Sequence, residues 1–196
     1  MKITWEDIDA VEGWLFMEEA DLLTKLAKAM PPGCEWCEIG SYKGRSTLAF
    51  LRSGRMGYAI DWFQGSPEMP EGTNTLADFV KVLNKYDPIC LVFTCMERSE
   101  VAVNNIPDHI GVLFIDGEHS YEAVKKDFEL YKNKVVEGGY IVFHDAWGDE
   151  GQEGPPTPWP GVTQFVKELR DSPEWEETHK VRRCAAFRKI FIPEDQ

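Results

Sequence analysis

The sequence contains neither a long hydrophobic run nor a basic N-terminal leader. No apolar stretch approaches the ~20 residues that a membrane-spanning helix needs. A secretory signal peptide would begin with basic residues and an apolar core, whereas this N-terminus carries Trp5, Glu6 and Asp7, followed by Glu18 and Glu19. We therefore expect a cytoplasmic protein that does not bind a membrane.

Positive charge is also scarce. The chain has 21 basic against 34 acidic residues and a net charge of -13, and this charge repels nucleic acid and anionic lipid. Residues 180–183 and 188–189 are locally basic, but such short charge runs are typical of solvated strand surfaces. The composition therefore disfavours a nucleic-acid partner, and it leaves a homo-oligomer open.

Cysteines are few and odd in number. Five cysteines fit a reducing compartment better than a disulfide framework. Cys34 and Cys37 have the C-x-x-C spacing of redox and zinc sites, but they lead into a predicted strand, where residues three apart point to opposite faces. The sequence offers no second Cys/His pair to complete a zinc site. We interpret both cysteines as core residues.

Apolar periodicity predicts a leading helix over residues 17–30 and then alternating strands and helices. The predicted strands are residues 35–39, 57–60, 89–93, 111–115 and 139–143. The helices between them are residues 45–52, 76–86, 97–104 and 121–131, with Thr75 and Ser120 as N-caps. A helix over residues 162–169 and strands near 178–183 and 185–191 complete the pattern.

Several predicted strands, such as 111–115 and 139–143, are continuously apolar, as a parallel sheet covered by helices on both faces requires. The last two strands fit an antiparallel pair. The expected fold is α/β: a doubly wound, Rossmann-like three-layer sandwich with a mostly parallel seven-stranded sheet and an antiparallel C-terminal strand pair. With 43% hydrophobic residues, we expect one domain over residues 1–196, made of an N-terminal helical segment (1–33) and an α/β core (34–196).

The segment E-I-G-S-Y-K-G-R-S, which begins at Glu38, is a buried strand that breaks into a glycine turn and starts a helix. Nucleotide-like ligands bind at such junctions, where glycine lets them approach the main chain. Asp61 follows Gly40 by about 20 residues, the spacing of a ribose-binding carboxylate. Tyr42 and Arg45 stand where a dinucleotide fingerprint needs glycine. The turn therefore favours a nucleoside without a diphosphate and disfavours a nicotinamide-dependent oxidoreductase.

A second group of polar residues follows two strands predicted to be neighbours: Asp116 and His119 after one, His144 and Asp145 after the other. Two carboxylates and an imidazole can hold magnesium, calcium or manganese. Either histidine can also act as a base, with an ordinary pKa of about 6.5. The alternative is structural, because polar residues collect at strand ends in any α/β protein. The grouping of four favours a catalytic site.

Two long loops, residues 62–73 and 146–160, also follow the carboxyl ends of strands, where open α/β sheets bind ligands. Structureless loops of this length are usually functional. We expect them to act as lids, with surface insertions as the alternative.

Five segments together resemble a known family: E-I-G-S-Y-K-G-R-S-T, A-I-D-W, F-I-D-G-E-H-S-Y-E-A-V-K-K-D, E-G-G-Y-I-V-F-H-D and P-G-V-T-Q-F-V. Their order and spacing, over about residues 35–169, resemble the Methyltransf_24 family of class I S-adenosylmethionine-dependent methyltransferases. The resemblance implies that S-adenosylmethionine binds at Glu38, Gly40, Ser41, Tyr42, Gly44, Ser46, Asp61, Trp62, Ser99 and Asp116. Asp61 would contact the ribose and Ser99 the adenine side.

The resemblance also implies a metal and a reaction. Related sugar and macrolide O-methyltransferases hold magnesium with acidic residues at these two strand ends, which implies Asp116 and Asp145 here, with His144 where relatives often have an acidic residue. Imidazole suits manganese better than magnesium, or acts as a base. The implied activity is methyl transfer to a hydroxyl of a small polar acceptor such as a sugar, with His119 or His144 as the base. The alternative is a catalytically inactive S-adenosylmethionine-binding or interaction module.

Overall fold

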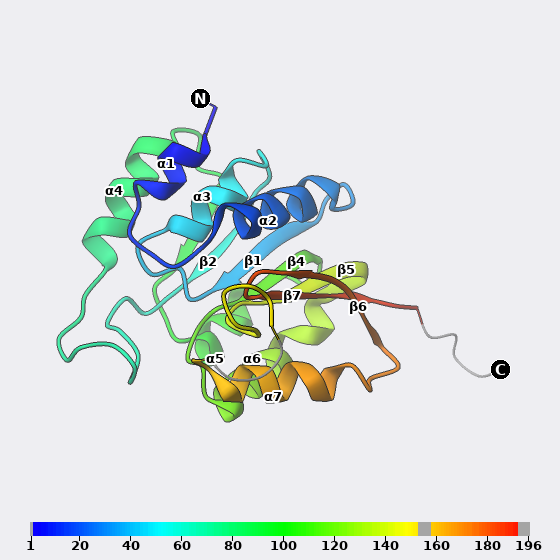
Figure 1. The fold of residues 1–196 in the computed structure, drawn as a ribbon. Coiled ribbons are helices and arrows are strands. Elements are labelled where there is room, and N and C mark those ends of the chain that lie inside the picture. The colour runs from blue at the N-terminus through cyan, green and yellow to red at the C-terminus, as the bar shows by residue number, and fades with distance from the viewer. Residues whose placement is uncertain (1, 153–157, 192–196) are drawn as a thin grey trace.

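The computed structural model describes residues 2–152 and 158–191. Across these residues the chain forms a seven-stranded sheet of order β3-β2-β1-β4-β5-β7-β6 (Figure 1). The strands are β1 (Glu35–Ile39), β2 (Gly57–Ile60), β3 (Val92–Cys95), β4 (Ile110–Ile115), β5 (Val135–Phe143), β6 (Trp175–Val181) and β7 (Cys184–Lys189). Strands β1 to β5 pair in parallel, and β7 pairs antiparallel with both β5 and β6. The predicted fold class is confirmed.

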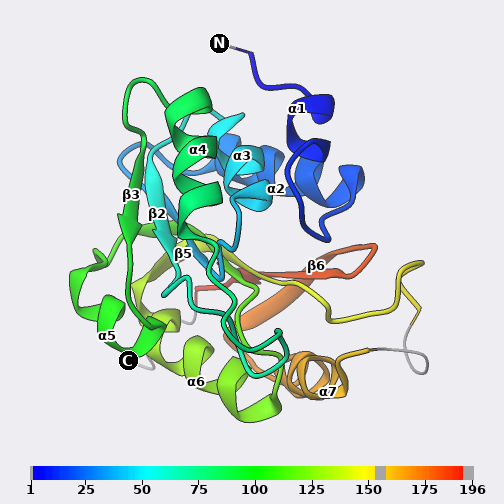
Figure 2. The same cartoon turned by 90° about the vertical axis from the view of Figure 1, so that its left-hand side faces the viewer.

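Helices cover both faces of this sheet, as Figures 1 and 2 show. One face carries α1 (Trp5–Asp9), α2 (Met17–Ala29), α3 (Arg45–Leu51) and α4 (Leu76–Tyr86). The other carries α5 (Ser99–Ala102), α6 (Tyr121–Tyr131) and α7 (Pro160–Leu169), with short 3-10 helices at Val103–Asn105 and Lys132–Lys134. None of the helices in the described residues is both long enough and apolar enough to cross a membrane.

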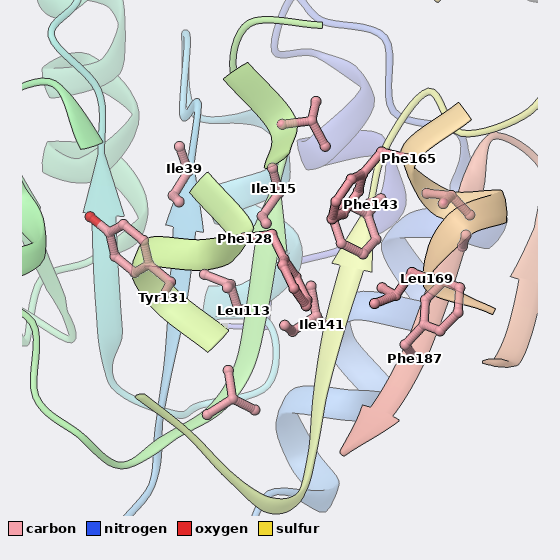
Figure 3. Packing of buried hydrophobic residues seen from close by; sticks show 14 of the residues in the cluster. Ile39, Leu113, Ile115, Phe128, Tyr131, Ile141, Phe143, Phe165, Leu169 and Phe187 are labelled. Atoms are coloured by element: carbon pink, nitrogen blue, oxygen red, sulfur yellow. The ribbon is translucent and has the colours of Figure 1, made fainter. Parts of the chain in front are cut away.

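Each face of the sheet has its own hydrophobic core. On the α6 and α7 side, Phe128 lies against Phe165 with ring centroids 5.2 Å apart, over the strand residues Leu113 and Phe143 (Figure 3). On the other side, Trp36 stacks on Phe50 at 4.7 Å. Burying one such side chain contributes roughly 1.5–3 kcal/mol. The two cores pack the helices onto both faces of the sheet, and the loops at its carboxyl end lie outside them.

The C-x-x-C cysteines fall on opposite sides of the sheet, as the strand spacing predicted. Cys37 is fully buried in the core beneath α6, whereas Cys34 is half-buried and packs against the core beneath α2. Both thiols are free. Cys37 is therefore a core residue, as predicted, whereas Cys34 lies at the edge of the core.

Several element boundaries differ from the predictions. The third strand starts at Val92, not at Ile89, which is 73% exposed. The Asp87 carboxylate accepts hydrogen bonds from the backbone N–H groups of Leu91 and Val92, at 2.8 and 2.9 Å, and Cys90 adopts a φ of +56°. A turn therefore occupies apolar residues that by composition suit a strand.

The other differences are smaller. The helix predicted over 97–104 divides into α5 and a 3-10 turn, β5 begins before the predicted 139, and the last two strands lie a few residues earlier. Helix α1 was not predicted; a capping box between Thr4 and Asp7 stabilises its start. Ser120 caps α6 as predicted, but the Thr75 side chain makes no capping bond, and Asn74 accepts from the Leu76 N–H instead.

Candidate active site

The turn after β1 needs glycine at position 40. Gly40 has a φ of +90°, and a Cβ atom there would lie 2.0 Å from the carbonyl oxygen of Asp116. The turns after β1 and β4 are therefore in backbone contact. Tyr42, two residues on, has a left-handed φ of +49°, a conformation that non-glycine residues adopt mainly where the surrounding structure enforces it.

Asp61, at the end of β2, ties this turn to the next one. Its Oδ2 accepts a hydrogen bond from the Tyr42 N–H at 2.7 Å, and its Oδ1 accepts from the Phe63 N–H at 2.6 Å. Burial raises the pKa of Asp61, and these backbone donors oppose the shift. Each carboxylate oxygen has a second lone pair, so Asp61 can still accept hydrogen bonds from a ligand.

A cavity of about 610 Å³ opens at the carboxyl ends of the parallel strands. The predicted site residues in its wall are Gly40, Tyr42, Asp61, Trp62, Ser99, Asp116, His119, His144 and Asp145. The structure therefore brings the glycine turn, the candidate ribose carboxylate and the four polar strand-end residues to one space.

Four predicted cofactor residues, Glu38, Ser41, Gly44 and Ser46, are absent from the cavity wall. Glu38 is fully buried, and its Oε2 accepts a hydrogen bond from the Thr47 hydroxyl at 2.6 Å. Burial raises the pKa of Glu38 to about 7, against the opposing effect of the Ser46, Thr47 and Ser41 hydroxyls. The strand directs the Glu38 side chain toward α3. These residues therefore support the turn from the side opposite the cavity.

His119, His144, Asp116 and Asp145 form one cluster. His144 Nδ1 lies 3.2 Å from Asp116 Oδ1 and 3.3 Å from Asp145 Oδ2. His119 Nε2 lies 3.3 Å from the same Asp145 oxygen and 3.6 Å from Asp116 Oδ1. Asp145 has a left-handed φ of +54°, and such strain often marks a functional residue.

The cluster carries paired charges. Burial alone would lower the pKa of both histidines, but Asp116 and Asp145 reverse this effect. They raise the pKa of His119 to about 10 and that of His144 well above its ordinary value. The two rings in turn hold the pKa of both carboxyls below the ordinary value, despite burial. The ordinary histidine pKa of about 6.5, expected from the sequence, therefore does not apply here.

Two members of this network come from elements that the sequence did not connect to the site. Arg183, between β6 and β7, donates from Nη1 to Asp145 Oδ1 at 3.0 Å. Glu19, in α2, is fully buried, and its Oε2 lies 3.3 Å from His144 Nε2. Glu19 Oε1 also accepts from the Arg183 N–H at 2.8 Å.

Both long loops reach the cluster. Glu68, in the loop after β2, accepts from the His119 N–H at 3.0 Å, and its Oε2 lies 3.4 Å from His119 Nδ1. Trp159, at the end of the second loop, stacks on the His119 ring with centroids 4.3 Å apart. Figure 2 shows the loop from β2 to α4 crossing toward α6 and α7. Residues 153–157 of the second predicted lid lie outside the described residues.

The cluster also fits a divalent cation. One ligand atom each from Asp116, His144 and Asp145 can be chosen so that all three lie within 4.8 Å of one another. His144 Nδ1 and His119 Nε2 are buried, yet in the part of the chain that the structure describes neither has an aligned hydrogen-bond partner. Two carboxylate oxygens and one imidazole nitrogen suit manganese, and magnesium less well.

Comparisons with known proteins agree with the fold. The chain resembles solved structures of the S-adenosylhomocysteine-bound methyltransferase PaMTH1 from Podospora anserina (16% identity, 95% of this chain and 86% of that one, TM-score 0.69) and of an O-methyltransferase from Bacillus cereus in complex with S-adenosylhomocysteine (14%, 95% and 88%, 0.65). The O-methyltransferase TomG from Streptomyces achromogenes is also similar (16%, 90% and 81%, 0.62). At these identities the likeness shows the fold alone.

Sequence comparison adds a curated relative and a family. An uncharacterized protein, R132, of Acanthamoeba polyphaga mimivirus is 38% identical over 68 residues, which are 35% of this chain but only 29% of that protein. The Methyltransf_24 family model, a methyltransferase domain, matches residues 37–146. This match covers more than half of the chain and contains the glycine turn, Asp61 and the whole strand-end cluster. The chain therefore belongs to the Methyltransf_24 family of class I methyltransferases.

Proposed function

We propose that this protein transfers a methyl group from S-adenosylmethionine to a hydroxyl of a small polar acceptor such as a sugar, with the assistance of a divalent cation. One observation carries the proposal: the Gly40 turn and Asp61 share a single cavity with the cluster of Asp116, His119, His144 and Asp145. The S-adenosylhomocysteine held by the similar Podospora and Bacillus proteins supports the choice of cofactor.

The glycine turn and Asp61 form the cofactor end of the cavity in this proposal. Gly40 lets a ligand approach the backbone, and Asp61 accepts hydrogen bonds from the ribose hydroxyls. Bound S-adenosylmethionine would supply an electrophilic methyl group and leave as S-adenosylhomocysteine. The protein then has to align the acceptor oxygen with the methyl group and remove the proton of the hydroxyl.

Of the two histidines, His119 is the better placed to take that proton. Its side chain is 16% exposed toward the cavity, whereas that of His144 is 2% exposed and is enclosed by Glu19, Asp116 and Asp145. A base has to come within hydrogen-bond reach of the hydroxyl. We assign His119 as the base and His144 as a fixed member of the metal site.

The metal ligands in this proposal are Asp116, His144 and Asp145. A bound divalent cation would lower the pKa of an acceptor hydroxyl. His144 has to lose the proton on Nδ1 before it can bind a metal, so metal binding should release protons. Arg183 stays beside Asp145 Oδ1 and leaves Oδ2 to face the two rings.

The test combines binding and turnover. Calorimetry with S-adenosylhomocysteine, before and after chelation and with added manganese or magnesium, measures cofactor and metal binding. Methyl transfer is then followed over a panel of hydroxylated acceptors. His119→Ala should abolish turnover and leave S-adenosylhomocysteine affinity nearly unchanged, while His179→Ala, a substitution on the distant strand β6, should affect neither.

The outcomes separate the competing functions. Tight S-adenosylhomocysteine binding with no turnover over the whole panel would favour an inactive binding module. Tighter binding of NADH than of S-adenosylhomocysteine would overturn the assignment to methyl transfer. An unimpaired rate in His119→Ala would remove His119 from the mechanism.

A further inference from the structure

A single side chain connects the loop after β2, residues 62–73, by hydrogen bonds to the opposite wall of the cavity. Glu68 Oε1 accepts a hydrogen bond from the backbone N–H of His119 at 3.0 Å, although 51 positions separate the two residues in the chain. In the part of the chain that the structure describes, every other hydrogen bond of residues 64–73 stays inside the loop. The position of this loop beside the cavity therefore depends on Glu68.

The same carboxylate also faces the imidazole ring of His119. Glu68 Oε2 lies 3.4 Å from His119 Nδ1, and the Ser66 hydroxyl donates to this oxygen at 2.8 Å. The side chains of Glu68 and His119 are only 22% and 16% exposed, so water competes little for the contact. An ionised carboxylate has no proton to donate. The proton between the two groups therefore belongs to the ring, and Glu68 keeps it on Nδ1.

The other ring nitrogen of His119 faces the strand-end cluster. Nε2 lies 3.3 Å from Asp145 Oδ2, and among the described residues it has no aligned hydrogen-bond partner. In a neutral imidazole one nitrogen carries the proton and the other carries a free lone pair. With the proton on Nδ1, the lone pair of the neutral ring is on Nε2. Trp159 stacks on the ring with centroids 4.3 Å apart and limits its tilt, so contacts from both long loops fix the direction of Nε2.

We propose that Glu68 is a positioning residue that links the placement of the 62–73 loop to the tautomer and orientation of His119. This inference rests on the proposed function, in which His119 takes the proton of the acceptor hydroxyl. The O–H bond breaks as its proton moves to Nε2, and the oxygen electron pair forms the new C–O bond while the C–S electrons stay on sulfur. Nδ1 keeps its proton throughout, and the Glu68 carboxylate stabilises the imidazolium that forms. A base oriented by a third group is the arrangement on which such proton transfers depend.

Two substitutions at Glu68 separate the tautomer from the loop. Glu68→Gln keeps a carbonyl oxygen that can accept from the His119 N–H, but it places an amide N–H against Nδ1. The neutral ring must then carry its proton on Nε2, where it cannot act as a base. With the acceptor that gives the highest wild-type rate in the hydroxylated panel, kcat should fall by at least ~100-fold while the KM values stay near those of the wild type. Glu68→Ala removes both contacts and should lower kcat as well. Glu71→Gln, at an exposed position in the same loop, is the matched control and should keep the wild-type kcat.

Hydrogen exchange of the amides in residues 64–73, followed by mass spectrometry without any acceptor, measures the loop independently of turnover. Glu68→Gln should keep the wild-type exchange rates, and Glu68→Ala should exchange faster. If Glu68 only holds the loop, Glu68→Gln should retain the wild-type kcat and only Glu68→Ala should be impaired. That result, or unchanged exchange in Glu68→Ala, overturns the inference while the proposed function stands. No turnover by the wild type over the whole panel overturns the proposed function and the inference with it.

Discussion

Glu19 Oε2 lies 3.3 Å from His144 Nε2, and both side chains are buried. The same carboxylate accepts hydrogen bonds from the Phe16 N–H at 2.8 Å and from the Arg183 N–H at 2.8 Å. One side chain therefore joins the start of α2, the β6–β7 turn and the candidate metal site. Helix α2 therefore contributes to the candidate site and also covers the sheet.

We expect Glu19→Ala to be strongly destabilising. It leaves two backbone N–H groups without an acceptor and removes a buried partner of His144, a type of change that costs about 3–5 kcal/mol. Urea denaturation measures the loss. Glu18→Gln is the control: Glu18 is exposed and pairs with Arg182 at the surface, so it should cost less than about 1 kcal/mol. Equal losses in the two variants would contradict a special role for Glu19.

Two glycines with similar backbone angles should respond very differently to alanine. Gly40 and Gly33 have φ values of +90° and +82°, but an added Cβ lies 2.0 Å from the Asp116 carbonyl oxygen at Gly40 and meets nothing within 4 Å at Gly33. Gly33→Ala should cost about 1–2 kcal/mol from backbone strain alone. Gly40→Ala adds a backbone clash and should cost more than about 4 kcal/mol. Thermal unfolding of both variants compares them, and similar midpoints would show that the β1 turn moves freely away from β4.

Glu38 should make stability depend on pH. Its pKa rises from 4.5 to about 7 on folding, because burial disfavours the charge. A carboxyl whose pKa is raised binds its proton more tightly in the folded state. The stabilising contribution of protonated Glu38 is therefore complete below pH 4.5 and is lost as pH rises through 7. The loss is on the order of 3 kcal/mol, at 1.4 kcal/mol per pKa unit.

Glu38→Gln should remove this loss, since the amide is neutral and still accepts from Thr47. We expect the variant to match the wild type near pH 4.5 and to be more stable at pH 8, as measured by urea denaturation at both pH values. Glu71→Gln, at an exposed position, should change neither. A variant that is less stable than the wild type at pH 8 would show that the charged form of Glu38 is needed to hold the turn.

The sequence alone located those parts of the site that follow strand ends. Gly40, Asp61, Asp116 and His144 come directly after strands that run in parallel, so their proximity follows from the topology. The remaining side chains come from positions whose proximity to the site does not follow from the order of the strands. Glu19 reads as an ordinary acidic residue in the first turn of a helix, and only tertiary packing buries it.

The direction and the environment of these side chains could not be predicted from the sequence either. Glu38 belongs to the glycine motif, but its side chain points away from the cavity. Asp127 is the last residue of the F-I-D-G-E-H-S-Y-E-A-V-K-K-D segment, where the sequence suggests a surface residue of a helix, but the structure buries it. The raised pKa of His119 depends on two carboxylates that converge only in three dimensions. A sequence pattern places backbone reliably, but burial and charge pairing depend on neighbours that are distant along the chain.

His119 should give the methyl-transfer rate an alkaline pH dependence when divalent cations have been removed. Asp116 and Asp145 raise the pKa of His119 to about 10, and a base acts only in its deprotonated form. The rate should therefore increase as pH rises from 7 toward 10, instead of levelling off near the ordinary histidine pKa of about 6.5. The ion pairs stabilise the fold below pH 6.5 and are lost as pH rises through 10, so circular dichroism must confirm folding at each pH. Asp145→Asn removes one paired carboxylate and should shift the rise to lower pH, whereas a wild-type profile that is flat above pH 7 would contradict His119 as the base.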